Sequence, residues 1–260
     1  MNKPLCFALL IFLTAGSAAL LCAVPPQSQV PAPPRTAVAP LSGRLATVVI
    51  DPAHGGADAG ARGSTGTIES EAVLDFGRAI RVALEAKGFR ALLTREGNQS
   101  PSVDDRSAMV NGLSDAIFIT LHVSSTGAPG TARAYFCAIF PAPPRPQTTG
   151  AAPPPRRAPG LLEWDRAQQP YLELSQRLAE LVQIQLAQQF QGSPETPSSA
   201  PIRQLRTVAA PAIAIELSNV SFDAARLSQM GQPLGQALAR AAAAFQEALT
   251  VSAADAGTAR

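Results

Sequence analysis

Residues 45–56 read LATVVIDPAHGG, a short aliphatic run that ends in an acid, a proline, a histidine and two glycines. The run does not alternate between polar and apolar positions, which is typical of a strand covered on both faces. Such strands belong to parallel sheets with helices on either side. The stretch therefore predicts an α/β fold, with polar residues placed just beyond the end of a buried strand.

The chain on either side of this stretch alternates between strand and helix patterns. The clearest helix is 69–87, where apolar residues recur at helical spacing until Gly88 ends the pattern. This alternation predicts a single α/β domain with a mainly parallel sheet flanked by helices. We expect strands at 45–50, 89–94, 116–121, 132–140 and 211–217, and helices at 69–87, 103–113, 171–190 and 223–250.

Composition places this domain between less structured segments. The chain has 260 residues, of which 46% are hydrophobic, enough for one sizeable core. Its 24 prolines cluster at 25–40, 141–158 and 193–201, which predicts loop or linker there. A net charge of +2 gives no electrostatic footprint for nucleic acid. The expected parts are a linker at 25–44, a catalytic domain at 45–250 with a proline-rich insert at 141–160, and a tail at 251–260.

The N-terminal residues 1–24 predict export. A lysine is followed by an apolar run, small residues and then prolines, the layout of a secretory signal with cleavage after Ala23. Two alternatives stay open: an uncleaved membrane anchor, since the apolar run is about long enough to span a bilayer, and lipidation at Cys22. Leu21 is bulkier than a lipidation site usually accepts. Each route leads to the periplasm or cell envelope.

Cysteine usage leaves the domain without an internal disulfide. Cys6 and Cys22 belong to the N-terminal segment, so Cys137 is the only cysteine of the mature domain. Cys137 lies in the apolar run AYFCAIF. We therefore expect a buried small hydrophobic residue rather than a nucleophile.

Three ionisable residues stand at or just beyond the ends of predicted strands: His54, His122 and Glu216. The carboxyl ends of parallel strands form one shared crevice, so these side chains are expected to meet there. A carboxylate inside the apolar run PAIAIEL needs a partner, and a cation would serve. Two histidines and one carboxylate are a known zinc set with a fourth position open for water. Taken alone, a histidine after a strand is more often a hydrogen-bonded structural residue than a metal ligand.

The residues around His54 support a tight loop. Gly55 and Gly56 let the backbone fold closely beside the histidine. Asp51 could orient this loop or accept a hydrogen bond from a histidine N–H, or it could simply form a turn before the proline. Glu69 begins the predicted helix, where an acid normally complements the helix dipole.

In chain order the sequence carries DPAHGG (51–56), Glu69 followed by Leu74, LLTRE (92–96), VDDRSAMVN (103–111), FITLH (118–122) and PAIAIE (211–216). This series resembles the motifs of the zinc-dependent N-acetylmuramoyl-L-alanine amidases that release peptidoglycan stem peptides. The resemblance extends over about 45–250. It implies a mixed α/β sheet of about six strands flanked by helices.

The resemblance also implies roles for individual residues. His54, Glu69 and His122 would bind one zinc ion, and Glu216 would be the catalytic acid and base. Asp51, Arg106 and Ser124 would support the site or line the substrate groove. The implied reaction is hydrolysis of the amide between N-acetylmuramic acid and L-alanine. Peptidoglycan is the expected partner of a monomer, with an activator protein or a membrane tether to localise it, since no wall-targeting module is recognised outside the domain.

Departures from the family pattern keep two alternatives open. Ala53 replaces a glycine, Ser70 stands where lysine is usual, Ser124 stands where asparagine is frequent, and LSNVSF (217–222) replaces the usual residues after the acid. The alternatives are a catalytically silent wall-binding or regulatory homologue and a zinc amidase or peptidase that acts on another exported amide. Glu163 and Asp165, which follow the insert, could approach the metal, although a solvated loop is the simpler interpretation.

Overall fold

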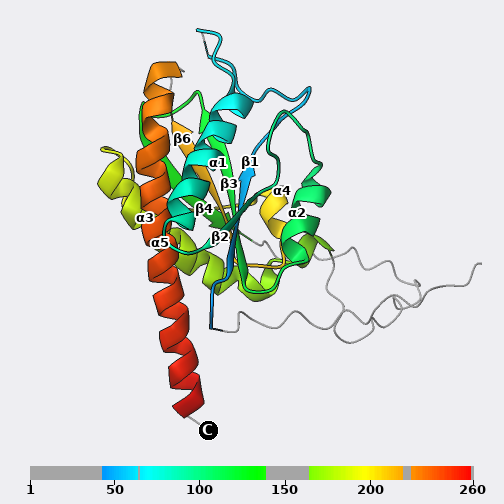
Figure 1. Cartoon of the computed structure of the whole chain (residues 1–260), viewed down its shortest axis with the longest axis vertical. Helices are drawn as coiled ribbons and strands as arrows, with labels where there is room; N and C mark the ends of the chain where they lie inside the picture. The colour runs from blue at the N-terminus through cyan, green and yellow to red at the C-terminus, as the bar shows by residue number, and fades with distance from the viewer. Residues whose placement is uncertain (1–42, 64, 139–163, 219–223, 259–260) are drawn as a thin grey trace, which may run out of the picture. The chain divides into compact units, whose positions relative to one another are not determined.

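The major strands and helices follow one another as the sequence pattern predicts (Figure 1). The computed structural model describes residues 43–63, 65–138, 164–218 and 224–258. Its elements are β1 (Thr47–Pro52), α1 (Glu69–Glu85), β2 (Arg90–Leu93), α2 (Val103–Asn111), β3 (Ala116–Ser124), β4 (Thr131–Cys137), two 3-10 turns (Trp164–Arg166 and Gln169–Tyr171), α3 (Leu172–Gln189), β5 (Ser198–Ala200), α4 (Arg203–Arg206), β6 (Ala212–Ser218) and α5 (Ala224–Thr258).

The strands form one six-stranded sheet in the order β2-β1-β3-β6-β4-β5. β2, β1, β3 and β6 run parallel, whereas β4 runs antiparallel to β6 and carries β5 parallel to itself. The predicted mixed, mostly parallel sheet of about six strands is confirmed. Because four neighbouring strands point the same way, their carboxyl ends share one edge.

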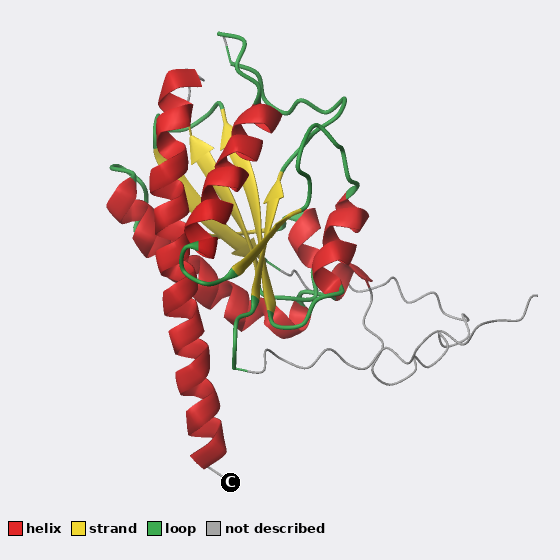
Figure 2. Cartoon of the chain, in the orientation of Figure 1, coloured by secondary structure: helices red, strands yellow, loops and turns green. Residues whose placement is uncertain are grey.

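Both faces of the sheet are covered by helices, as Figure 2 shows. On one face α1, α3 and α5 pack against alternate strand residues such as Ile50 and Ile119. On the other face Val49 and Phe118 belong to a second core with residues of α2 and α4. Every residue of β1 is buried, which is why its sequence is a continuous apolar run rather than an alternating one.

Close packing of α1 against α5 depends on glycine. A Cβ added to Gly235 would lie 2.9 Å from the carbonyl oxygen of Ala79 and 3.2 Å from the Cβ of Ala83.

α5 continues to Thr258, beyond the helix end predicted at residue 250, so 251–258 are helical rather than a tail.

Two small elements were not predicted. β5 lies within the proline-rich stretch 193–201 that was expected to be loop, and α4 follows it directly. Three residues, SSA, carry no hydrophobic period; pairing with the edge of β4, from Tyr135↔Ser198 to Cys137↔Ala200, makes them a strand. Cys137 itself is buried and free, as expected, and burial raises the pKa of its thiol.

Several predictions concern residues outside the described ones. These are the signal or anchor at 1–24, nearly all of the linker at 25–44, the insert at 141–160, and Glu163. Among the helices that the structure does describe, none has both the length and the apolar character needed to cross a membrane.

Candidate active site

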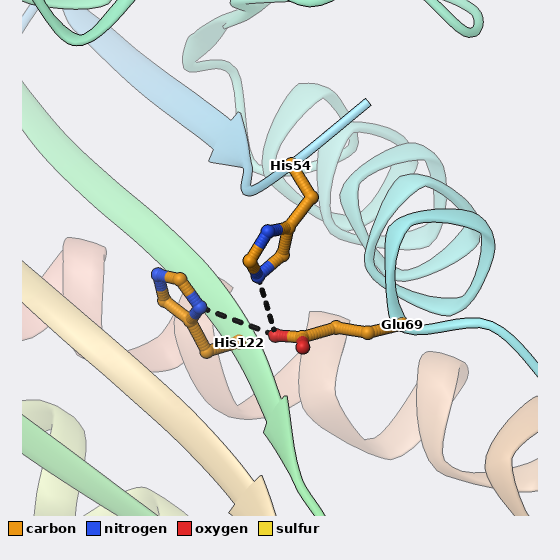
Figure 3. Close-up of side chains that lie close together, drawn as sticks. All are labelled: His54, Glu69 and His122. Carbon is orange, nitrogen blue, oxygen red and sulfur yellow. Dashed lines mark hydrogen bonds and ion pairs between the residues drawn. The ribbon is translucent and has the colours of Figure 1, made fainter. Parts of the chain in front are cut away.

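The three predicted ligands His54, Glu69 and His122 come together at one end of the sheet (Figure 3). One ligand atom of each lies within 4.8 Å of the others. His54 Nε2 and His122 Nδ1 each lie 3.2 Å from Glu69 Oε1, and the two rings meet edge to face with centroids 5.3 Å apart. Three segments far apart in the sequence thus deliver two imidazole nitrogens and a carboxylate oxygen to one point.

His54 has an unusual backbone conformation. Its φ is 63°, in the left-handed region, and it is followed by Gly55 and Gly56 with φ of 121° and 60°. A Cβ added to Gly55 would collide with the carbonyl oxygen of Gln99. Gly55 is therefore required by close backbone approach as well as by its dihedral angle, while a Cβ on Gly56 would lie 2.8 Å from the Cβ of Ser100.

Two buried arginines hold this loop by its carbonyl groups. Arg106 Nη1 donates to Pro52 O at 2.8 Å and Nη2 donates to His54 O at 2.7 Å. Arg95 donates to Pro52 O at 2.9 Å, to Ala53 O at 2.9 Å and to Ser70 O at 2.6 Å. The loop geometry is thus set by side chains from α2 and from the segment that follows β2, as well as by the glycines.

Asp51 holds Arg106, and through it the loop around His54, by a buried ion pair. Its carboxylate is fully buried and accepts hydrogen bonds from Arg106, Thr94, Thr120 and Gln204. Of the two site roles considered for Asp51, its contacts match the support of the loop, and none of these hydrogen bonds involves a histidine. Arg106 is 5% exposed, so it lies under the loop rather than on a groove.

The acid beside Nδ1 of His54 is Asp58, a residue that was not predicted to belong to the site. His54 Nδ1 and Asp58 Oδ2 are 2.8 Å apart, and Asp58 Oδ1 accepts from Gly60 N at 3.1 Å. This contact leaves Nε2 to face Glu69. The available signal was an aspartate four residues after the histidine, in HGGAD.

Glu69 is a buried carboxylate rather than a solvated helix-capping acid. Its Oε1 accepts from Val123 N at 3.0 Å and its Oε2 accepts from Ala61 N at 2.8 Å. Burial by itself raises the pKa of this carboxyl, but hydrogen bonds from both histidines and both amides hold the pKa well below its ordinary value. Glu69 therefore stays ionised, as a metal ligand has to be.

The same carboxylate acts on His54. Hydrogen bonding to Glu69 raises the pKa of His54 to about 9; burial opposes this rise and the hydrogen bond to Asp58 adds to it. With both ring nitrogens facing carboxylates, the protonated imidazole is the favoured form when only these groups are present.

Glu216 lies beside this cluster. It is the register neighbour of His122 on the adjacent parallel strand, and both line a cleft of about 500 Å³ together with Glu69. The apolar strand around Glu216 pointed to a cation as its partner; the partner observed among the described residues is Tyr135, whose hydroxyl donates to Glu216 Oε2 at 3.0 Å. The rest of the cleft wall is largely apolar, with Ala200, Ile202 and Ala214.

The remaining predicted positions divide between the cleft and its surroundings. Ser124 lines the cleft, but its Oγ also accepts from Thr126 N at 3.1 Å and bonds the Thr126 hydroxyl at 2.8 Å. Ser70 and Ala53 are buried, and their carbonyls accept from Arg95, so two of the departures from the family pattern lie around Arg95 rather than on the cleft lining. Asp165 is exposed and is not part of the metal-ligand cluster.

Comparison with known proteins gives this site its context. The family profile described as N-acetylmuramoyl-L-alanine amidase matches residues 48–244, which contain every element from β1 into α5 and all four predicted chemical residues. The chain belongs to this amidase family. The family resemblance noted in the sequence is thereby confirmed.

Individual amidases match shorter segments. The chain is 36% identical over 88 residues to a sporulation-specific N-acetylmuramoyl-L-alanine amidase of Bacillus subtilis (strain 168), covering 33% of this chain and 34% of the relative. It is 34% identical over 98 residues to the amidase AmiA of Escherichia coli (strain K12), covering 38% and 34%. The matched segments thus span about a third of the length of these curated relatives.

Solved amidase structures share the fold over a longer part of the chain. The CwlD amidase from Clostridioides difficile, solved in complex with the GerS lipoprotein, superposes with a TM-score of 0.57 at 16% identity. The superposition covers 78% of this chain and 99% of that one. At this identity the likeness concerns the fold of the amidase domain.

Proposed function

We propose that this chain is a zinc-dependent N-acetylmuramoyl-L-alanine amidase that cleaves the amide joining the lactyl group of N-acetylmuramic acid to the L-alanine of a stem peptide. The observation that carries the proposal is that Glu216 shares one cleft with Glu69 and His122 of the metal-ligand cluster. Membership of the amidase family supports the same reaction.

The ligand set fits one zinc ion. His54 Nε2, His122 Nδ1 and Glu69 Oε1 are the atoms that would hold it, and two imidazoles with one carboxylate are a known catalytic zinc set. Zinc bound there would supply a water of lowered pKa and polarise the scissile carbonyl. Asp58 would fix the tautomer of His54, while Asp51, through Arg106, would keep the histidine loop in shape.

Glu216 would carry the proton transfers. As a carboxylate in the cleft it would accept a proton from the attacking water and then deliver it to the departing alanine nitrogen, because an amide nitrogen leaves poorly without one. The apolar wall formed by Ala200, Ile202 and Ala214 suits the methyl groups of the lactyl and alanyl units on either side of the bond. Ser124 would line the groove that receives the substrate.

The proposal is tested by Glu216→Gln, which keeps the size of the side chain and removes its proton chemistry. We expect this variant to bind about one equivalent of zinc, like the parent, and to release no peptide from purified sacculi, while His122→Ala loses the metal as well. Mass spectrometry of the products identifies the bond that is cut, which separates this amidase from a peptidase.

Two results would overturn it. Full activity of Glu216→Gln would remove the assigned role of that residue. Binding of less than about a tenth of an equivalent of zinc by the parent domain would favour a catalytically silent homologue instead.

The proposal includes location and partners. Export through residues 1–24, followed by the linker at 25–44, would bring the domain at 45–250 to peptidoglycan in the periplasm or cell envelope. One solved relative is in complex with a lipoprotein, which supports a search for an activator or tether of this chain. Deleting the insert at 141–160 and measuring activity would show whether that segment restricts access to the cleft.

A further inference from the structure

A tyrosine reaches across from the neighbouring strand to the proposed catalytic acid. β4 runs antiparallel to β6, and its register pairs Tyr135 with Ala214, two residues before Glu216. Side chains two residues apart on a strand share a face, so Tyr135 and Glu216 project into the same cleft. The Tyr135 hydroxyl donates to Glu216 Oε2 at 3.0 Å.

We propose that Tyr135 is a positioning residue that holds Glu216 through Oε2, so that Oε1 is the oxygen that exchanges the proton with water and amide. The inference rests on the proposed function, because it assigns Tyr135 a part in the same proton transfers. Nothing in the spacing of the sequence motifs points to Tyr135; only the antiparallel register of β4 places it beside Glu216.

The physical reason lies in the freedom of a glutamate side chain. Three rotatable bonds separate the carboxylate from the backbone, and an unanchored carboxylate in an open cleft occupies several rotamers. A misplacement of about 1 Å can cost about a hundredfold in rate. A hydrogen bond from a rigid ring on the adjoining strand selects one orientation in advance of substrate binding.

Tyr135 is suited to donate rather than accept. Burial raises the pKa of its hydroxyl, and the hydrogen bond to Glu216 raises it further, while Arg133 acts in the opposite direction. The phenol therefore keeps its proton at neutral pH, and an ionised carboxylate can only accept from it.

The chain offers a matched control, since its sequence contains two tyrosines. Tyr171 is buried, and within the described residues its hydroxyl has no hydrogen-bond partner. Both Tyr135→Phe and Tyr171→Phe remove one hydroxyl from a partly or fully buried ring, but only the first removes a contact to Glu216.

The test uses the full mature chain loaded with zinc and a soluble N-acetylmuramoyl peptide as substrate. We expect Tyr135→Phe to lower kcat about tenfold to a hundredfold with KM and zinc content unchanged, and Tyr171→Phe to match the parent. Equal kcat for Tyr135→Phe and the parent, or a loss confined to KM or to zinc content, would refute the positioning role.

A second variant shows whether the effect passes through Glu216. Glu216→Asp shortens the side chain and withdraws its carboxylate from the Tyr135 hydroxyl, while keeping an acid in the cleft. Tyr135→Phe should then cause less than a twofold further loss of kcat in the Glu216→Asp background. Independent, multiplying losses would show that Tyr135 acts elsewhere.

A structural readout keeps the inference separate from the proposed function. In a crystal structure of Tyr135→Phe, the Glu216 carboxylate should leave its single orientation or spread over several. If the Glu216 carboxylate keeps the same orientation in Tyr135→Phe as in the parent, the positioning role is refuted, even if the parent proves inactive on muropeptides. Inactivity of the parent, with a displaced Glu216 in the variant, would instead count against the reaction assigned above.

Discussion

At the scale of single residues, the site depends on the hydrogen bonds that hold the backbone and side chains of the predicted metal ligands in place. His54 holds a left-handed backbone conformation, which costs a residue with a side chain about 1–3 kcal/mol. The conformation persists because Arg106 and Arg95 donate hydrogen bonds to the carbonyls of the loop. The buried carboxylate of Asp51 in turn fixes Arg106. His54 is therefore held at the proposed metal site by residues that are not themselves part of the ligand cluster.

Asp58→Asn tests this support of His54. An asparagine can present an N–H to the ring nitrogen instead of accepting from it, so the favoured tautomer is lost; we expect zinc affinity to fall about 10-fold to 100-fold. Chelator competition measures the affinity. Because Asp58 is exposed, the melting temperature of the metal-free protein should change little.

The control for Asp58→Asn is Asp75→Asn. Asp75 is also exposed and also forms a local ion pair, with Arg78 on α1, but it lies away from the histidines. The Asp75→Asn substitution should leave zinc affinity unchanged. Equal affinities for the two variants would show that the contact between His54 and Asp58 does not orient the ring.

At the scale of elements, the helix layer formed by α1, α3 and α5 explains one unusual feature of the long last helix. α5 contains Gly231 and Gly235, although glycine costs a helix interior about 1 kcal/mol relative to alanine. At Gly235 the cost is offset by the close approach of α1, where Ala79 leaves no room for a Cβ. At Gly231 a Cβ would meet only ordinary contacts, 3.5 Å from the Cβ of Ala79.

The two glycines therefore make a matched pair of substitutions. Gly231→Ala and Gly235→Ala gain the same helix propensity, so their difference isolates the packing clash. We expect Gly235→Ala to be less stable than Gly231→Ala by about 1–3 kcal/mol, the usual cost of overpacking. For a domain of this size that corresponds to about 2–4 °C in Tm per kcal/mol, measured by thermal unfolding. Equal melting temperatures would mean that α1 and α5 separate without cost.

At the scale of the whole domain, the parallel order β1-β3-β6 makes the site. Because these strands share a direction, the loop after β1 and the ends of β3 and β6 open on one edge, and α1 begins at the same edge with Glu69. Reversal of any one strand would carry its ligand to the opposite end of the sheet. The antiparallel β4 then adds Tyr135 from outside this parallel set.

At the proposed zinc site a metal ion would compete with the proton on His54, so we expect the response of the domain to zinc to depend on pH. The raised pKa of His54, about 9, means that its proton stabilises the metal-free fold fully below its ordinary value of 6.5, and that this stabilisation is lost as the pH rises through about 9. Zinc has to displace that proton. Each pH unit below about 9 should therefore weaken zinc binding about tenfold.

Thermal unfolding measures the consequence. The rise in Tm on adding a fixed excess of zinc should be larger at pH 8 than at pH 6.5, because a ligand stabilises the fold in proportion to the logarithm of its concentration over its Kd. A zinc-induced shift of the same size at both pH values would show that His54 carries no extra proton in the metal-free protein.

The α/β class and the order of the major elements could be predicted from the sequence, which also singled out His54, Glu69, His122 and Glu216 as candidates. The structure brings the first three together and places Glu216 in a cleft with two of them. Continuous apolar runs, helical spacing and motif order are local properties, so they can be read along the chain. The short strand β5 was missed, since pairing with β4 forms it more than local preference does. The helical residues of α5 beyond 250 were predicted as a tail, and that prediction was wrong.

The supporting contacts around these four residues emerge only from the three-dimensional fold. Asp58 faces His54 because a left-handed residue and two glycines turn the loop back on itself. Arg106 reaches that loop from α2, across 52 residues of sequence, and Tyr135 reaches Glu216 through the reversed direction of β4. These contacts depend on strand direction and side-chain geometry in three dimensions, neither of which is encoded in the spacing of residues along the chain.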